Sequence, residues 1–176
     1  MWVEKSGTVY PTAPGTIAGR FDKESCQFKN AQFTEIENDF NKFQKNLREI
    51  RNHKKFKIIL TVSPVPLTAT ASDNHILAST IYSKSILRAV AGQLATNQQH
   101  IDYFPSYKIA TNPRMHSMSF EHNLRTIRAE AVENIMNHFF AEHPPISIQK
   151  ETENSSKGYN DSSIKCEEEL IETFGR

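Results

Sequence analysis

The chain has 176 residues, of which 38% are hydrophobic, and its mean hydropathy of −0.56 is typical of one soluble, polar domain. Its formal net charge of +1, from 21 Lys and Arg against 20 Asp and Glu, removes the electrostatic argument for nucleic acid or an anionic membrane as a partner. No apolar run approaches the roughly 20 residues of a membrane span and no signal peptide is visible, so we expect a cytoplasmic protein.

Residues 1–30 are rich in glycine and proline, which predicts irregular structure lying across a larger element. Residues 7–11 can form a short extended piece that Pro11 ends. Cys26 lies in this region and the other cysteine, Cys166, lies far along the chain. This separation is typical of reduced thiols and not of a disulfide framework.

Residues 31–53 carry the clearest helical pattern. Acidic residues dominate its first half and basic residues its second half, which suits the helix dipole. The stripe runs for only about three heptads, so it predicts a helix packed on a sheet more than a coiled coil. The apolar positions recur at spacings of three and four: Phe33, Ile36, Phe40, Phe43, Leu47 and Ile50.

Residues 56–62 are apolar on both faces and β-branched, which predicts a buried parallel strand that the prolines after Ser63 end. A second helix is predicted over 75–95 and a second short strand over 101–104, stopped by Pro105. The apolar side of that helix comprises Leu77, Ile81, Leu87, Val90, Ala91 and Leu94.

The last third of the chain changes character twice. Residues 105–125 are predicted to be irregular, and residues 126–140 to form a third helix. Residues 146–176 carry seven acids against four bases and few large apolar residues, which predicts a disordered tail. The domain is therefore expected to span residues 1–145.

Alternating helices and strands predict an α/β fold with a parallel sheet. Only two convincing strands are present, and two strands under three amphipathic helices leave both sheet edges open. We therefore interpret the chain as an incomplete domain. A partner that is the N-terminal half of the same domain would then supply strands to the same sheet.

In open α/β sheets the functional site lies beyond the carboxyl ends of the strands. A histidine in the segment that follows them can act as general base to a serine, although an isolated loop histidine is more often only solvated. Ser63 either caps its turn or lines a pocket, and Arg125 either binds an anion or pairs with an acid. The candidate bases are His116 and His122, and the candidate pocket-lining residues are Ser63, Pro64, Val65, Pro66, Tyr107, Arg114, Asn123 and Arg125.

Several other chemistries lack their motifs. The sequence contains no nucleophile-elbow, P-loop or dinucleotide-binding glycine pattern. Its histidines lack the H-E-x-x-H spacing and its cysteines lack C-x-x-C. We therefore expect no metal and no cofactor.

Several strings resemble the GSCFA domain family over roughly residues 1–143. The most specific are residues 57–67, which contain T-V-S-P-V-P-L, and residues 102–107, which contain Y-F-P-S-Y. Ser83-Lys84-Ser85, the opening at 6–15 and the region 123–132 also fit the family.

The resemblance implies a fold and a chemistry. The family is similar to SGNH/GDSL hydrolases, which have a three-layer α/β/α fold and cleave esters with a serine nucleophile. That serine belongs to a Gly-Ser-Cys block, which this sequence does not contain; Ser25-Cys26 follows Glu24 instead of glycine. The Asp-x-x-His of SGNH enzymes is matched only by Ser119-Phe120-Glu121-His122, which lacks the aspartate, or by Asn123 and Thr126.

Two function classes follow. The first is the C-terminal part of a serine ester hydrolase, inactive alone, with an acyl ester as substrate and acylated glycans as one class by analogy. The alternative is a non-catalytic binding or accessory module, or a degenerate relative, that docks on a separately encoded N-terminal half. A truncated product without a function of its own is not separated from that alternative.

Overall fold

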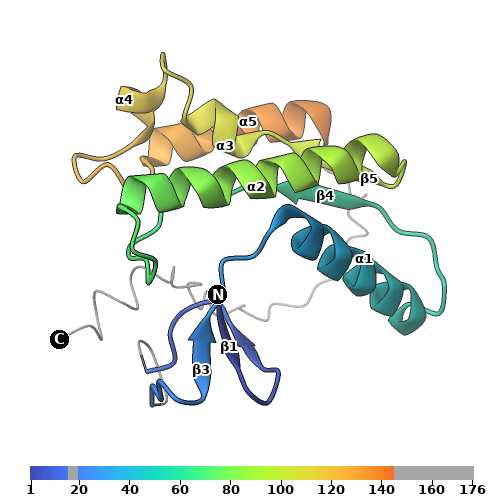
Figure 1. The fold of residues 1–176 in the computed structure, drawn as a ribbon. Coiled ribbons are helices and arrows are strands. Elements are labelled where there is room, and N and C mark those ends of the chain that lie inside the picture. The colour runs from blue at the N-terminus through green and yellow to red at the C-terminus, as the bar shows by residue number, and fades with distance from the viewer. Residues whose placement is uncertain (16–19, 145–176) are drawn as a thin grey trace, which may run out of the picture. The chain divides into compact units, whose positions relative to one another are not determined.

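The computed structural model describes residues 1–15 and 20–144, so the disordered tail expected at 146–176 lies outside the described residues. The chain divides into two compact units, one containing Met1–Asn30 and the other Ala31–Pro145. Each unit is described by itself, and Figure 1 shows the elements of both. Within the described ranges, no helix combines the length and the apolar character needed to cross a bilayer.

The first unit is a small antiparallel sheet. Its strands β1 (Trp2–Glu4), β2 (Val9–Tyr10) and β3 (Cys26–Phe28) lie in the order β2-β1-β3. The prediction of irregular structure at 1–30 is therefore wrong for these segments, although the extended piece expected at 7–11 contains β2. Strands of two or three residues are too short to show an alternating pattern, because one alternation needs at least four.

The second unit is a mixed α/β structure with a two-stranded parallel sheet, as predicted. In chain order it contains α1 (Phe33–Ile50), β4 (Ile58–Thr61), α2 (Ile76–Asn97), β5 (Ile101–Phe104), α3 (Ser106–Ala110), α4 (His116–Ser119) and α5 (Ala129–Glu142). Strands β4 and β5 pair in parallel, with Ile58 opposite Ile101 and Thr61 opposite Phe104. The segment 105–125, predicted to be irregular, contains the short helices α3 and α4.

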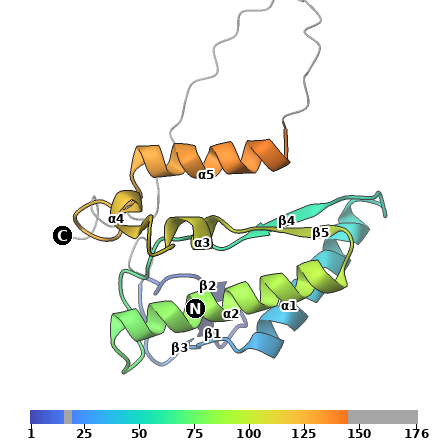
Figure 2. The same cartoon turned by 90° about the horizontal axis from the view of Figure 1, so that it is seen from above.

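Helices lie on both faces of this sheet, with α1 and α2 on one side and α5 on the other (Figure 2). Alternation along the strands explains the arrangement, because successive side chains point to opposite faces. Ile101, which is 2% exposed, packs with residues of α1 and α2. Phe104 packs on the other face against Ala110 of α3 and Ile135 of α5.

The apolar stripes of α1 and α2 are only partly buried. On α1, Phe33, Ile36 and Phe40 contact the core, whereas Phe43 is 51% exposed. On α2, the apolar residues Val90, Ala91 and Leu94 are buried, whereas Leu77, Ile81 and Leu87 are exposed. Large hydrophobic side chains of this unit that remain exposed are Phe43, Ile50, Ile59, Leu77, Ile81, Tyr82, Leu87, Met118, Leu124, Val132, Met136 and Phe140.

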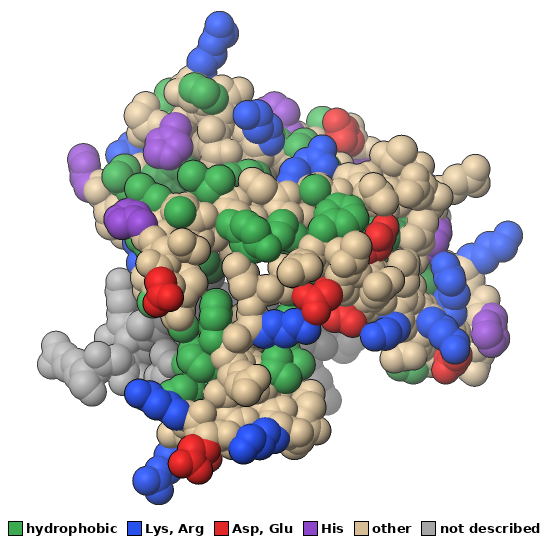
Figure 3. Space-filling model, in the orientation of Figure 1, with side chains coloured by type: hydrophobic (Ala, Val, Ile, Leu, Met, Phe, Trp, Pro, Cys, Tyr) green, Lys and Arg blue, Asp and Glu red, His purple; other side chains and the backbone are tan. Residues whose placement is uncertain are grey.

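This exposed apolar surface is extensive for so small a unit. Figure 3 shows hydrophobic side chains gathered on the face where α2 lies in front. Scattered exposed hydrophobic residues are normal, but several on successive turns of one helix form a contiguous apolar patch. The prediction that helix surface stays unburied is consistent with this exposure.

Candidate functional site

The carboxyl ends of β4 and β5 are joined by hydrogen bonds at the start of α3. The Ser106 hydroxyl donates to the carbonyl oxygen of Val62 at 3.0 Å, and Thr61 Oγ1 lies 2.6 Å from Ser106 Oγ. Because Ser106 has one hydroxyl proton, Thr61 is the donor in the second bond. These bonds fix the point at which both strands end, which is the edge where the site was expected.

The segment after β4 is held by two further hydrogen bonds. The Ser63 hydroxyl accepts from the backbone N–H of Val65 at 3.2 Å, so it caps the turn. The N–H of Leu67 donates to Thr80 Oγ1 on α2, also at 3.2 Å. Ser63 itself is exposed, and the expected pocket-lining residues that follow it, Pro64, Val65 and Pro66, are half-buried.

Arg125 brings two distant segments of the expected site together. Its guanidinium donates to Thr68 Oγ1, which links the loop after β4 to the loop before α5. Asn123 builds that second loop, because its side-chain oxygen accepts from the N–H groups of Arg125 and Thr126 at 2.9 and 3.0 Å. Leu124 between them has a left-handed backbone with φ of 57°. Asn123 therefore shapes the loop that positions Arg125.

The two candidate bases are solvent-exposed. The His116 ring lies against the Phe120 ring, with the centroids 4.9 Å apart. Within residues 1–15 and 20–144, the His122 side chain has no hydrogen-bond partner. Glu121, the acid next to His122, lies 3.7 Å from Arg128 Nε. Within the part of the chain that the structure describes, neither imidazole therefore has a carboxylate that orients it.

The remaining expected residues lie around the same edge. Tyr107 is a half-buried residue of α3, and its carbonyl oxygen accepts a hydrogen bond from Thr111 Oγ1 at 2.7 Å. Arg114 is exposed, and its backbone N–H donates to Asn112 Oδ1 at 3.1 Å. The structure thus places both on the segment that follows β5.

A cluster on α2 was not predicted as a site. Lys84 is only 8% exposed, and burial lowers the pKa of its amine. Arg88, one turn later, lies over the Tyr103 ring at 4.1 Å from the centroid. The Tyr103 hydroxyl is buried without a hydrogen-bond partner among the described residues, and burial raises its pKa, with Arg88 opposing the effect. The sequence signal for this cluster was Lys84, a charged residue among small and apolar residues of α2.

The described residues contain no metal-ligand cluster and one cysteine, which is not in a disulfide. In residues 1–15 and 20–144, no three His, Cys, Asp or Glu side chains gather as metal ligands would. Cys26 is buried and is a free thiol.

Comparison with known proteins gives one match. The family model described as GSCFA family matches residues 1–139. No curated protein and no solved structure matches the chain.

Proposed function

The chain belongs to the GSCFA family, and on that premise we propose that residues 1–145 form the C-terminal portion of an SGNH-like serine ester hydrolase domain. The match over residues 1–139 carries this proposal. The reaction transfers an acyl group from an ester to water through an acyl-enzyme, and an acylated glycan is one class of substrate. The nucleophilic serine and its Gly-Ser-Cys block are supplied by residues outside this sequence.

The architecture we propose for the whole domain is a three-layer α/β/α fold. Two features support it. The pairing of β4 with β5 is parallel, and helices already lie on both faces of the pair. Further strands added at an open edge would bury the exposed Leu77 and Ile81 of α2 and the exposed Ile59 of β4.

The site we propose is the edge where β4 and β5 end. The loop after β4 and the loop before α5 form one wall, with Ser63–Pro66, Tyr107, Arg114, Asn123 and Arg125 as lining residues, and Arg125 joins the two loops. His122 or His116 would take the serine proton, and the exposure of both leaves them accessible to an incoming serine. No metal or cofactor enters the mechanism, and we propose a cytoplasmic location.

The first experiment measures hydrolysis of p-nitrophenyl acetate by the 176-residue chain. We expect no turnover above buffer, because a base cannot replace the absent nucleophile and oxyanion donors. Turnover by the chain alone that Ser25→Ala abolishes would overturn the proposal, because the nucleophile would then be present.

The second experiment completes the domain. DNA upstream of the Met1 codon is read in all frames for a Gly-Ser-Cys block, and that segment is co-expressed with the chain. We expect activity to return, and His122→Ala or His116→Ala to lower kcat roughly 10²- to 10⁴-fold. His138→Ala, at an exposed histidine on α5, is the matched control. A stoichiometric complex without activity would favour the non-catalytic accessory module instead.

A further inference from the structure

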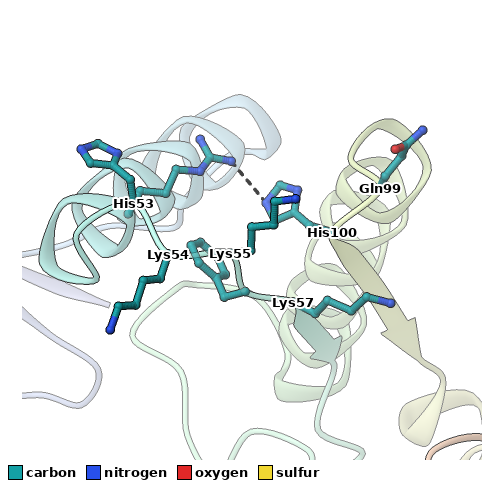
Figure 4. A pocket seen from close by; sticks show the side chains of 8 residues that line it. His53, Lys54, Lys55, Lys57, Gln99 and His100 are labelled. Atoms are coloured by element: carbon teal, nitrogen blue, oxygen red, sulfur yellow. Dashed lines mark hydrogen bonds between the residues drawn. The ribbon is translucent and has the colours of Figure 1, made fainter.

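A second site lies at the opposite end of the same two strands. Where β4 and β5 begin, the structure has a pocket of about 760 Å³ formed by the end of α1, the segment that leads into β4 and the turn before β5. Figure 4 shows it from close by. Its lining residues are Arg48, His53, Lys54, Lys55, Phe56, Lys57, Gln99 and His100.

The charged side chains that line this pocket are all positive. Four of its lining residues are cations, and none of the lining residues is a carboxylate. Basic residues at a helix C-terminus are common because they complement the dipole, which accounts for Arg48 in the last turn of α1. Lys54, Lys55 and Lys57 come after the helix has ended, so the dipole does not account for them.

The turn between α1 and β4 fixes where these lysines begin. The N–H of Asn52 donates to the Glu49 carbonyl at 3.0 Å and the N–H of His53 donates to the Arg48 carbonyl at 2.8 Å. This is the Schellman pattern, here with Asn52 and His53 in left-handed conformations, at φ of 50° and 59°. Figure 4 shows Lys54 and Lys57 extending to either side of Lys55.

One side chain of the pocket, His100, is held by a hydrogen-bond network around the buried Gln44. His100 Nε2 lies 2.8 Å from Oε1 of Gln44, which is 2% exposed. Asn41 Oδ1 accepts from the side-chain amides of both Gln44 and Gln98, at 3.2 Å each. Because Gln44 donates to Asn41, its oxygen faces the imidazole, so His100 Nε2 carries a proton and donates.

That tautomer leaves Arg48 available. Arg48 Nη2 lies 3.3 Å from the same His100 nitrogen, marked by the dashed line in Figure 4. A nitrogen that carries a proton cannot also accept from the guanidinium, so the Arg48 donors remain free for a ligand. A guanidinium with unused paired donors recognises phosphate oxygens well.

We propose that this pocket binds a small anion that carries more than one phosphate group. Its volume is that of a small-molecule site. Four cations around one pocket exceed what one phosphate needs, whereas a di- or triphosphate spreads its charge among them. Nucleic acid is disfavoured, because the chain has a net charge of only +1 and a duplex or strand requires an extended basic stripe. This site does not depend on the ester hydrolase proposal.

The test is isothermal titration of the full chain with inorganic tripolyphosphate at low salt. We expect saturable binding of one ligand per chain. The double variant Lys55→Gln/Lys57→Gln should weaken it by about tenfold or more, because two charge-assisted contacts are lost. The matched control is Lys45→Gln/Lys108→Gln, which removes the same charge from two exposed lysines outside the pocket and should leave the affinity unchanged. All four lysines are exposed, so we expect both variants to fold, and thermal melts by circular dichroism verify this.

A further measurement distinguishes a lipid headgroup from a free phosphate compound as the natural ligand. Vesicles containing a phosphoinositide, compared with phosphatidylcholine vesicles, test a lipid headgroup against the free anion. Binding of either source that the pocket variant weakens and the control variant does not supports the site. Absence of saturable binding, or equal weakening by both double variants, overturns it. Tighter binding of a single-stranded oligonucleotide than of tripolyphosphate would also overturn it in favour of nucleic acid.

Discussion

At the scale of single residues, the least expected feature is a buried amide in an apolar stripe. Gln44 lies one turn after Phe40 on the inner side of α1, where the spacing favours a hydrophobic side chain. It is buried because both ends of its amide have partners, Asn41 and His100. The helical pattern did not predict the burial of Gln44, because one of its partners, His100, is far away in the sequence.

Replacing Gln44 tests this network. Gln44→Leu keeps most of the volume but leaves the partner groups on Asn41 and His100 without their bonds. We expect the free energy of unfolding to fall by about 1–3 kcal/mol. Urea denaturation measures it, and Gln99→Leu, at the exposed glutamine beside His100, should cost less than about 0.5 kcal/mol. Equal effects of the two substitutions would mean that the amide is not held as described.

Lys84 gives a prediction that depends on pH. Burial lowers its pKa below the ordinary value of 10.5, so between the two values the unfolded chain binds more protons than the folded chain. The contribution of Lys84 to stability is therefore unfavourable at neutral pH and becomes less so as pH rises towards 10.5.

We accordingly expect Lys84→Met to raise the free energy of unfolding at pH 7 by on the order of 1 kcal/mol. The difference between the variant and the parent should shrink as pH approaches 10. Urea melts at several pH values measure it, and Lys45→Met, at an exposed lysine of α1, should show no such trend. A difference that grows with pH would contradict the burial of the amine.

At the scale of elements, the two faces of the parallel sheet are buried to different extents. Ile101 is 2% exposed and packs under α1 and α2, whereas Ile59 on the other face is 40% exposed. The loss of a buried isoleucine removes both transfer free energy and packing, and leaves a cavity that the surroundings fill only in part.

A matched pair of substitutions follows from this difference. Ile101→Ala should lower the free energy of unfolding by about 2–5 kcal/mol. Ile59→Ala in the isolated chain should cost clearly less, because much of its side chain already contacts water. Thermal or urea melts give both values. Similar losses would show that the exposed face of the sheet is covered in solution, for example by a second copy of the chain.

Length and the positions of prolines decide how well the elements could be predicted. Helices α1, α2 and α5 and strands β4 and β5 lie close to the ranges expected from apolar spacing and from the prolines after β4 and β5. The strands β1–β3 have two or three residues, and α3 and α4 have five and four, which is less than two helical turns, so no period repeats in them. Strands β4 and β5 have only four residues each, and the prolines that follow them made them predictable. The basic pocket was missed for another reason. Its lysines and His100 are far apart in sequence, and only the parallel register of Ile58 with Ile101 brings them together.

At the scale of the whole molecule, the exposed ridge of α5 is the most testable surface. Val132, Met136 and Phe140 recur every fourth residue and are 47%, 37% and 46% exposed. They lie beside Ile135, which packs on Phe104. A continuous apolar ridge of this kind binds hydrophobic dyes and promotes self-association.

We expect Met136→Ser/Phe140→Ser to reduce the fluorescence of bound 8-anilinonaphthalene-1-sulfonate while changing the free energy of unfolding by no more than about 1 kcal/mol. Glu133→Ser/Asn137→Ser changes two exposed polar residues of the same helix and should leave the fluorescence unaltered. If the dye signal stays the same in the serine variant of the ridge, the ridge is not the exposed surface in solution. The same ridge variant should also weaken docking of the segment that we propose completes the domain.

For the candidate site, the sequence predicts a location and not the roles of its residues, and both stay predictions. The rule for parallel sheets pointed to the segments after β4 and β5, and the Arg125 contact with Thr68 links those segments. The roles of His116 and His122 stay predictions, because a base is defined by the group whose proton it takes. No described serine lies within hydrogen-bond distance of either imidazole.

The succession of β4, α2 and β5 has a consequence for the order of folding. These three elements are neighbours in the chain, and Val90 and Leu94 of α2 form one core with Ile101 of β5. Closing the connection between the strands requires only that α2 forms, which is a short-range event compared with pairing distant strands. We therefore expect the φ-values of folding to be highest for residues of β4, α2 and β5. If the domain is completed as we propose, the edges of this sheet exist as templates before the other strands pair, so we expect the chain alone to be prone to aggregation.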